Sequence, residues 1–280
     1  MNVSKAVLIT GCSSGIGRAT AVHLSSVGWK VYATARDAES IASLERNGCQ
    51  LISLDVTDED SMRSAVGEIE RREGAVGVLV NNAGYSQSGA VEAVPMEKVR
   101  RQFETNFFGL ARMCQLVLPG MRRQGYGRIV NLSSMGGKLT FPGAGYYHAS
   151  KHAVEALSDA LRFEVAGFGV KVSVIEPGLI RTGFADAAVG SMDGSEDLYA
   201  GFEEAVARAT VENYERGPFS RLGGDPESVA RAIQAAISSR NPRSRYVVTP
   251  SAHLFLSLRR LLPDRAWDAA LRTSYPQPGR

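Results

Sequence analysis

The chain has few of the residues that bind metal ions or form disulfides. Its 280 residues include three cysteines, Cys12, Cys49 and Cys114, and four histidines. The cysteine count is odd and the spacing does not match a metal site, so we expect reduced thiols and no bound metal. His148 and His152 lie in a helical pattern, where we expect them on the helix surface.

Long apolar runs and strong charge asymmetry are also missing. No apolar stretch approaches the ~18 residues needed to span a bilayer. The N-terminus runs directly into a strand-like segment and lacks the layout of a signal peptide. The 32 basic and 29 acidic residues are interspersed and give a net charge of +3, without the basic tract typical of nucleic-acid binding. We therefore expect a cytoplasmic protein with no nucleic-acid partner and no stable membrane insertion.

Short apolar runs alternate with helical patterns along most of the chain. This alternation predicts an α/β fold, a single doubly wound parallel sheet of about seven strands with helices on both faces (Rossmann-type). One core of this size suits one domain spanning 1–280. The predicted strands are 5–10, 29–35, 50–54, 75–80, 128–133, 170–175 and 246–249, and the predicted helices are 18–27, 36–47, 59–73, 96–123, 146–167 and 226–239.

Two segments stand outside the alternation. Residues 183–222 have no strand pattern, and an insertion of this length is typical of a lid or substrate loop. Residues 251–280 predict a helical extension, with an amphipathic helix at 252–262 that Pro263 ends before a short segment with Trp267. We expect that helix to pack on its own core or on a partner subunit, with contact to a membrane surface as the alternative.

A glycine-rich turn follows the first predicted strand. Gly11 can make the tight turn, Gly15 allows the backbone to approach a diphosphate, and Gly17 allows the helix to pack closely on the strand. The amides of the new helix then face the phosphates. The GxxxGxG spacing differs from the commoner GxGxxG, so alone it is a weak signal.

Polar and small residues gather where the predicted strands end. In a parallel sheet these ends share one edge, beyond which ligands bind. The residues at this edge are Gly11, Arg36, Asp55, Asn82, Ser134 and Pro177.

Tyr147 and Lys151 are four residues apart on a predicted helix, which puts them on one face. A cation near a phenol lowers the pKa of the phenol from its usual ~10 and makes it usable as an acid or base. Ser134 lies near by, after a strand, where its hydroxyl can bind a substrate oxygen. A surface ion-pairing role for the Tyr and Lys, and capping by Ser133 and Ser134, are the alternatives.

These motifs together resemble the short-chain dehydrogenase/reductase family over about residues 5–250, particularly its NADP-dependent steroid- and retinol-dehydrogenase-like and carbonyl-reductase members. The resemblance rests on TGCSSGIG at 10–17, NNAG at 81–84, Asn106, Ser134, the Tyr147–Lys151 pair, and Pro177-Gly178 with Thr182. It implies hydride transfer between a nicotinamide cofactor and a carbonyl or alcohol, in a homo-oligomer. A fold-related epimerase or dehydratase and a non-catalytic nucleotide-sensing regulator are the rival interpretations.

The resemblance also implies the role of each site residue. Tyr147 is the proton donor or acceptor, Lys151 lowers the pKa of Tyr147 and holds the ribose, Ser134 orients the substrate oxygen, and Asn106 opens its helix and holds a water. An exposed helical position is the alternative for Asn106. The implied cofactor-binding residues are Gly11, Ser13, Ser14, Gly15, Ile16, Gly17, Arg36, Asp55, Val56, Asn82, Ala83, Gly84, Tyr147, Lys151, Pro177, Gly178, Ile180 and Thr182.

The end of the second strand favours NADP(H), with NAD as the weaker alternative. Ala35 stands where NAD-dependent members carry an aspartate, and Arg36 can clamp a 2′-phosphate. Asp37 would repel that phosphate if it turned inward, but it can cap the next helix instead.

Apolar side chains after Ser134 and in the 183–222 segment suggest a pocket for a bulky, apolar ketone, aldehyde or alcohol. The candidate substrate residues are Met135, Leu139, Phe141 and Phe184, and packing within a structural subdomain is the alternative for them.

Overall fold

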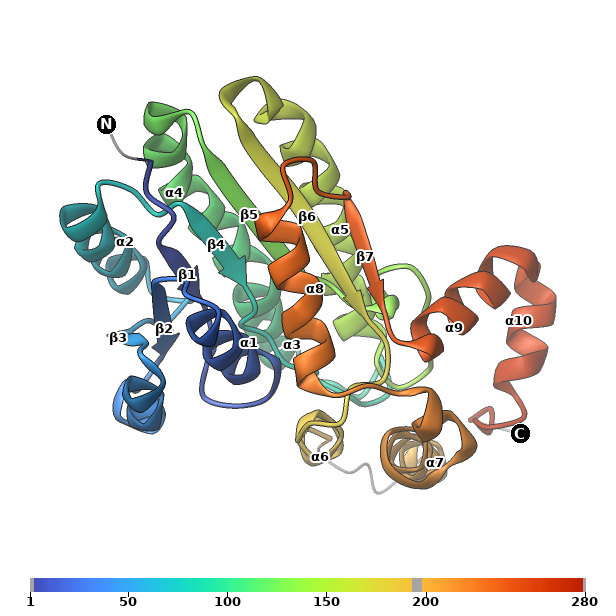
Figure 1. Cartoon of the computed structure of the whole chain (residues 1–280). Helices are drawn as coiled ribbons and strands as arrows, with labels where there is room; N and C mark the ends of the chain where they lie inside the picture. Colours follow the sequence, from blue (N-terminus) through green and yellow to red (C-terminus); the bar gives the residue numbers. More distant parts are fainter. Residues whose placement is uncertain (1–2, 193–197, 279–280) are drawn as a thin grey trace.

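Seven parallel strands form one sheet in the order β3-β2-β1-β4-β5-β6-β7 (Figure 1). The computed structural model describes residues 3–192 and 198–278. The order runs outward from β1 in both directions, which is the doubly wound arrangement predicted from the sequence, so that prediction is confirmed. The strands are β1 (Val7–Ile9), β2 (Val31–Ala35), β3 (Gln50–Ser53), β4 (Val78–Asn81), β5 (Gly127–Leu132), β6 (Val170–Pro177) and β7 (Arg245–Val248).

Helices cover both faces of the sheet. α1 and α8 pack on one face with the 3-10 helix η1, and α2, α4 and α5 pack on the other. The α-helices are α1 (Gly15–Ser26), α2 (Glu59–Glu73), α3 (Met96–Phe103), α4 (Gly109–Gln124), α5 (Gly145–Glu164), α6 (Phe184–Gly190), α7 (Ala200–Val211), α8 (Pro226–Ser238), α9 (Pro250–Leu261) and α10 (Asp264–Leu271). Short 3-10 helices are η1 (Glu39–Asn47), η3 (Met135–Gly137), η4 (Ala166–Phe168) and η6 (Pro218–Leu222), and π-helical turns are η2 (Glu104–Phe108) and η5 (Glu212–Arg216).

Side-chain alternation along the central strands fills both layers of the core. Leu8 and Leu79 face the α2, α4 and α5 layer, whereas Val7, Ile9 and Val80 face the α1 and α8 layer. All five are fully buried. Since burying one such side chain contributes about 1.5–3 kcal/mol, the two layers hold the strands in a fixed register.

Two predicted helices differ from the structure. The segment after β2 is the 3-10 helix η1, and it starts where the Glu39 amide donates to Asp37 Oδ1 at 2.9 Å. The predicted 96–123 helix is divided into α3, η2 and α4, and α4 continues past Pro119 to Gln124. α4 tolerates the internal Pro119, because burial of the α4 face outweighs the ~3 kcal/mol cost of an internal proline.

The predicted lid segment is mostly helical in the part that the structure describes. α6, α7, η5 and η6 lie within residues 183–222, and residues 193–197 of that prediction lie outside the described residues. Its two ends meet, since the Gly224 amide donates to Leu179 O at 2.8 Å and the Arg181 amide donates to Gly224 O at 2.9 Å. The segment therefore leaves the sheet and returns to it at one point beside β6. Its role as a lid stays a prediction.

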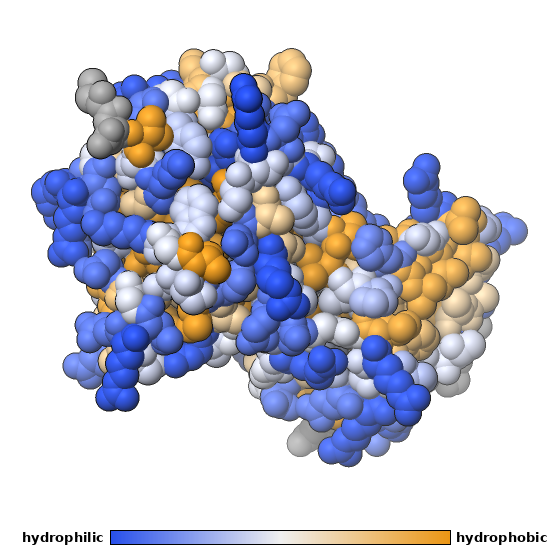
Figure 2. Space-filling view, in the orientation of Figure 1, coloured by the Kyte–Doolittle hydropathy of each residue, from blue (hydrophilic) through white to orange (hydrophobic). Residues whose placement is uncertain are grey.

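The C-terminal extension contains the predicted amphipathic helix as α9, and α10 follows it. Phe255 of α9 packs on Phe141, with ring centroids 5.7 Å apart, so this helix lies on its own core. Apolar surface gathers over α9 and α10 at the right of Figure 2, where Leu254, Leu258 and Leu261 are exposed. Within the described residues, no helix is both long and apolar enough to cross a bilayer.

Candidate active site

The glycine turn between β1 and α1 forms a tight cradle. Gly11 has φ +73°, a conformation that favours glycine. A methyl group on Gly17 would lie 2.2 Å from the Gly11 carbonyl oxygen and 2.4 Å from Asn82 Nδ2. Only a glycine fits at Gly17, so α1 begins directly against the turn and its first amides face the carboxyl edge of the sheet. This geometry fits the diphosphate of a dinucleotide.

The residues directly after β4 form hydrogen bonds with the glycine turn that follows β1. Asn82 Nδ2 donates to the carbonyl oxygens of Thr10 and Gly11, both at 2.9 Å. The amides of Asn82 and Ala83 donate to Thr10 Oγ1 at 3.0 and 2.9 Å. Ser13, Ser14 and Ile16 belong to the same turn and the first turn of α1, with both serines exposed.

The ends of β2 and β3 lie on the other side of the cradle. Arg36 is exposed directly after β2, while Asp37 is engaged in starting η1. Asp55 Oδ1 accepts hydrogen bonds from Thr57, from the amide at 2.8 Å and from the hydroxyl at 2.7 Å. Val56 is buried beneath that turn. The Arg36 side chain is therefore exposed at the end of β2, and the Asp37 carboxylate is turned toward the start of η1 instead of toward the glycine turn.

Ser134, Tyr147 and Lys151 are brought together from β5 and α5. The Ser134 hydroxyl lies close enough to the phenol of Tyr147 to lower its pKa in part. Ser134 also accepts from the Gly136 amide at 3.0 Å, which fixes its side chain at the start of η3. Ser133 is buried, so Ser134 is the serine that faces the phenol, as predicted.

Lys151 is not among the groups that shift the pKa of Tyr147 here, and its predicted effect on that pKa stays a prediction. Burial raises the pKa of Tyr147 to about 12, and the Ser134 hydroxyl lowers it only in part. Burial also lowers the pKa of Lys151 to about 8. Lys151 Nζ donates to Leu132 O at 2.7 Å and lies 5.8 Å from the Tyr147 ring centre, so desolvation outweighs the attraction between the two groups.

Asn106 is fully buried inside the π-helical turn η2, so the exposed alternative is wrong. Its Oδ1 accepts from the Tyr85 amide at 3.0 Å. Its Nδ2 donates to Tyr85 O at 2.9 Å and to Ser150 Oγ at 3.1 Å. The local opening of the helix agrees with the prediction, and a methyl group on Gly84 would lie 3.1 Å from Asn106 Oδ1 and 3.6 Å from Lys151 Nζ.

The loop after β6 closes the site on the side of the glycine turn. Pro177, Gly178 and Ile180 are buried, and a methyl group on Gly178 would lie 2.4 Å from Thr249 Oγ1. Thr182 comes within 3.5 Å of the position that a methyl group on Gly15 would take. The predicted loop and the glycine turn therefore meet across the cleft.

The family profile described as short chain dehydrogenase matches residues 5–191. The chain belongs to this family. It is 39% identical over 274 residues to 3-ketodihydrosphingosine reductase of Bacteroides thetaiotaomicron, covering 96% of this chain and 97% of that protein. It is 35% identical over 270 residues to NADPH-dependent 3-dehydrocapnine reductase of Ornithobacterium rhinotracheale, covering 93% and 94%.

Solved structures of short-chain dehydrogenases have the same fold. One from Streptomyces avermitilis has a TM-score of 0.79 at 36% identity, covering 96% of this chain and 97% of that chain. One from Burkholderia phymatum, in complex with NAD, has a TM-score of 0.78 at 27% identity and covers both chains completely. The resemblance predicted from the sequence is confirmed, and the chain is an oxidoreductase of this family.

Aromatic rings surround the phenol of this short-chain dehydrogenase. The Phe184 ring centre lies 5.5 Å from that of Tyr147 and 5.8 Å from that of Tyr214. Phe141 packs on Phe255 and, at 6.0 Å, on Trp267 of α10. Two of the four predicted substrate residues thus belong to a wall that runs from α5 to α10.

The other two predicted substrate residues lie deeper. Met135 and Leu139 are 7% and 2% exposed, and Met135 belongs to a small cluster with Leu179 and Ala252. Sequence reasoning missed Tyr275, which is close enough to Tyr214 to raise its pKa further, after burial and Tyr147. Tyr275 could not be predicted to lie near Tyr214, because the two residues are far apart in the sequence and Tyr275 is a single aromatic residue in a polar C-terminal segment.

The predicted surface position of His148 is wrong. His148 is 6% exposed, its Nδ1 lies 3.1 Å from Gly136 O, and burial lowers its pKa to about 4. His152 is exposed, as expected, with Nδ1 2.9 Å from His148 O. The neutral ring of His148 therefore stabilises η3 through its contact with Gly136 and through packing.

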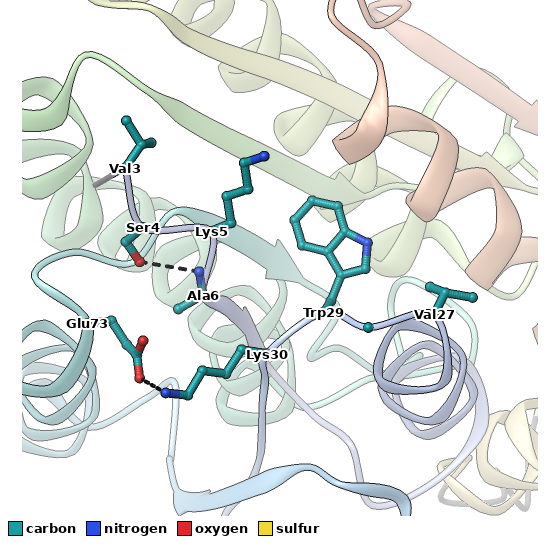
Figure 3. A pocket seen from close by; sticks show the side chains of 9 residues that line it. Val3, Ser4, Lys5, Ala6, Val27, Trp29, Lys30 and Glu73 are labelled. Atoms are coloured by element: carbon teal, nitrogen blue, oxygen red, sulfur yellow. Dashed lines mark hydrogen bonds and ion pairs between the residues drawn. The ribbon is translucent and has the colours of Figure 1, made fainter. Parts of the chain in front are cut away.

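A hollow lies at the opposite, amino-terminal edge of the sheet (Figure 3). Its polar groups are already engaged, since Lys30 forms an ion pair with Glu73 and the Ser4 hydroxyl donates to Ala75 O at 2.7 Å. None of the candidate catalytic residues lines it. Among the described residues there is no group of three His, Cys, Asp or Glu side chains placed to hold a metal ion.

Proposed function

We propose that the protein is an NADP-dependent reductase of ketones in bulky, apolar substrates. The observation that carries the proposal is the placement of the Ser134 hydroxyl close enough to Tyr147 to affect its pKa, with Lys151 one helical turn away on the same buried face of α5. The family membership of the chain supports the reaction class.

The cofactor would lie along the carboxyl edge of the sheet. The 11–17 turn would hold its diphosphate, residues 55–56 and 82–84 its adenosine side, and 177–182 with Lys151 its nicotinamide side. The bound cofactor supplies the hydride. The exposed guanidinium of Arg36 suits a 2′-phosphate because its planar fork gives two charge-assisted hydrogen bonds.

The protein supplies the proton. Tyr147 is neutral well above pH 7 because burial raises its pKa to about 12, so its hydroxyl is available as a donor to a developing alkoxide. Ser134 would donate a second hydrogen bond to that oxygen and keep it beside the phenol. A neutral phenol favours reduction, whereas oxidation needs the phenolate and should accelerate as pH rises.

Asn106 would support Tyr147 and Ser134 indirectly, through the position of α5. Its side chain ties Ser150 of α5 to the backbone at Tyr85, which keeps the catalytic helix in place. We propose that this is how it contributes to proton transfer, since it also lies next to Gly84 and Lys151.

The aromatic wall supports the substrate class. Phe184 and Tyr214 lie beside the phenol, and Phe141, Phe255 and Trp267 continue the apolar surface away from it. Two similar proteins are named as reductases of 3-ketodihydrosphingosine and 3-dehydrocapnine. We propose a ketone with a long aliphatic or polycyclic apolar part.

A substrate and cofactor panel tests this function. The purified protein is assayed by loss of nicotinamide absorbance with NADPH and with NADH, on 3-ketodihydrosphingosine, a steroid ketone, an aryl ketone and small polar ketones. We expect kcat/KM for at least one bulky ketone to exceed that for small polar ketones by about tenfold or more. Higher efficiency on small polar ketones would contradict the substrate class, and absence of turnover on every member would contradict the activity.

A further inference from the structure

Two buried carboxyl groups lie behind the catalytic residues and take no part in the proposed chemistry. Glu155 is one turn beyond Lys151 on α5, and its side chain is 4% exposed. Glu176 is near the end of β6, directly before Pro177, and its side chain is 3% exposed. Each therefore belongs to an element that also carries predicted site residues.

Arg245 of β7 holds the two carboxyl groups together. Its Nε lies 3.0 Å from Glu155 Oε2 and 3.2 Å from Glu176 Oε1. Its Nη2 lies 2.7 Å from Asp159 Oδ2. Lys138, just after η3, lies 3.2 Å from Glu155 Oε2. The cluster thus joins α5, β6, β7 and the loop that begins at Ser134.

Each carboxyl group has one buried oxygen, Oε1, that finds no hydrogen-bond partner among the described residues. A carboxylate can only accept hydrogen bonds, so a bond between the two carboxyl groups would require one proton between them. Burial first, and then the neighbouring Glu155, raise the pKa of Glu176 to about 7, against the opposing positive charges of Lys138 and Arg245. Both protonation states are therefore accessible near neutral pH.

We propose that Glu155 and Glu176 are positioning residues: they share one proton, and this shared proton holds the Ser134–Lys138 loop and the Pro177–Thr182 loop at the spacing that the cofactor needs. Loss of the proton leaves two carboxylates in contact inside the protein, and their repulsion separates the two loops. The inference rests on the proposed function only in the choice of NADPH as a probe.

Close packing carries the effect from the pair to both loops. A methyl group on Gly137 would lie 3.0 Å from Glu155 Cγ, 3.1 Å from Lys151 O and 2.5 Å from Ser133 Oγ, so η3 rests directly on α5 at this point. On the other side, Glu176 is bonded to Pro177, and Gly178 is packed against the start of α9. Because of these close contacts, a movement of the two carboxyl groups would shift both loops.

Solvent reaches the pair through a hollow between β7 and α9. The hollow is lined by Lys138, Asp159, Glu176, Arg245, Leu256, Arg259 and Arg260. Two other ion pairs engage charges around it, Arg162 with Asp159 at 2.7 Å and Arg259 with Asp264 at 2.6 Å. Protons can therefore exchange at Glu176 through this hollow.

The direction of the pH effect follows from the raised pKa of Glu176. The folded protein retains a proton that an unfolded glutamate loses near 4.5, so the stabilisation is complete below about pH 4.5 and is lost as pH rises to about 7. NADPH affinity should fall in the same direction if the shared proton positions the loops.

Glu176→Gln tests the proposal, because its amide keeps a donor toward Glu155 and an acceptor toward Arg245 at every pH. We expect the NADPH dissociation constant of the wild type to rise at least about fivefold between roughly pH 6 and 8.5, the lower end for coupled sites. In Glu176→Gln the constant should stay at the low-pH value up to about pH 7.5, above which the titration of Lys151 affects both proteins alike. A wild-type constant that does not change with pH, or a variant that follows the wild type, overturns the proposal.

Two readouts do not depend on cofactor or turnover. The infrared carbonyl stretch of a protonated carboxyl group should be present in the wild type at about pH 6 and absent in Glu176→Gln. The wild-type unfolding free energy, measured relative to Glu176→Gln, should fall from about pH 5 to 8. Absence of the carbonyl band in the wild type would overturn the shared proton even if the enzyme is active.

Asp159→Asn is the matched control. It removes a carboxylate from the other side of Arg245 but leaves the shared proton, so it should keep the pH dependence of NADPH binding. Loss of that dependence in Asp159→Asn would assign the effect to Arg245 and overturn the proposal. If Glu176→Gln fails to fold, Glu155→Gln replaces it, because it also leaves one amide and one carboxylate.

Discussion

Replacement of Gly17 by alanine should damage both the fold and the cofactor cradle. The new methyl group would meet the Gly11 carbonyl oxygen at 2.2 Å and Asn82 Nδ2 at 2.4 Å. The first is backbone of the tight turn, and the second donates the two 2.9 Å hydrogen bonds that fasten the turn to β4. Neither the Gly11 carbonyl oxygen nor Asn82 Nδ2 can move away from the new methyl group without loss of these hydrogen bonds.

The magnitude follows from three contributions. Overpacking costs about 1–3 kcal/mol, and the weakened Asn82 hydrogen bonds cost about 1 kcal/mol each. The alanine gains at most about 1 kcal/mol in helix propensity over glycine. The net expectation is a loss of about 2–5 kcal/mol in unfolding free energy, together with an NADPH affinity at least about tenfold weaker, which is about 1.4 kcal/mol.

The assay is urea denaturation of both proteins, with NADPH binding measured by fluorescence. Gly201→Ala is the control, because Gly201 also lies in the first turn of a helix and has nothing within 4 Å of the added methyl group. We expect the control to be neutral or to gain up to about 1 kcal/mol. A Gly17→Ala protein as stable as Gly201→Ala, with unchanged NADPH affinity, would refute the close packing on which the cradle depends.

Two further substitutions test the ends of the cleft. Arg36→Ala should weaken NADPH binding by about 1.5–3 kcal/mol, the range for hydrogen bonds to charged groups, and leave NADH binding nearly unchanged; an unaltered ratio of kcat/KM for the two cofactors would contradict the assignment. Asn106→Ala should lose three buried hydrogen bonds and destabilise the protein by about 2–4 kcal/mol while lowering kcat more than it raises KM; a thermal melt and steady-state rates equal to those of the wild type would contradict its bracing role.

The sheet and the edge that carries the site could be predicted because both depend on local patterns. Buried strands such as β1 and β5 are short apolar runs, and the carboxyl ends of parallel strands must share an edge. The opening of the helix at Asn106 followed from a family resemblance, and its buried partners at Tyr85 and Ser150 explain why the opening is stable.

The features that the sequence did not reveal depend on contacts between distant elements. Four-residue spacing places Lys151 near Tyr147 but does not show that Leu132 O takes its hydrogen bond or that burial dominates both pKa values. Arg245 meets Glu176 only because β7 pairs with β6. The contact of Trp267 with Phe141 likewise requires α10 to fold back on the core.

The proton donor is the central claim, and Tyr147→Phe tests it most directly. The variant removes one oxygen atom and keeps the ring that packs on Phe184. With a bulky ketone and saturating NADPH, we predict that kcat falls by about 10²–10⁴-fold, the usual contribution of positioned proton transfer, while the NADPH dissociation constant stays within about twofold. A Tyr147→Phe enzyme that retains more than about a tenth of the wild-type kcat would contradict the assignment of Tyr147 as the acid.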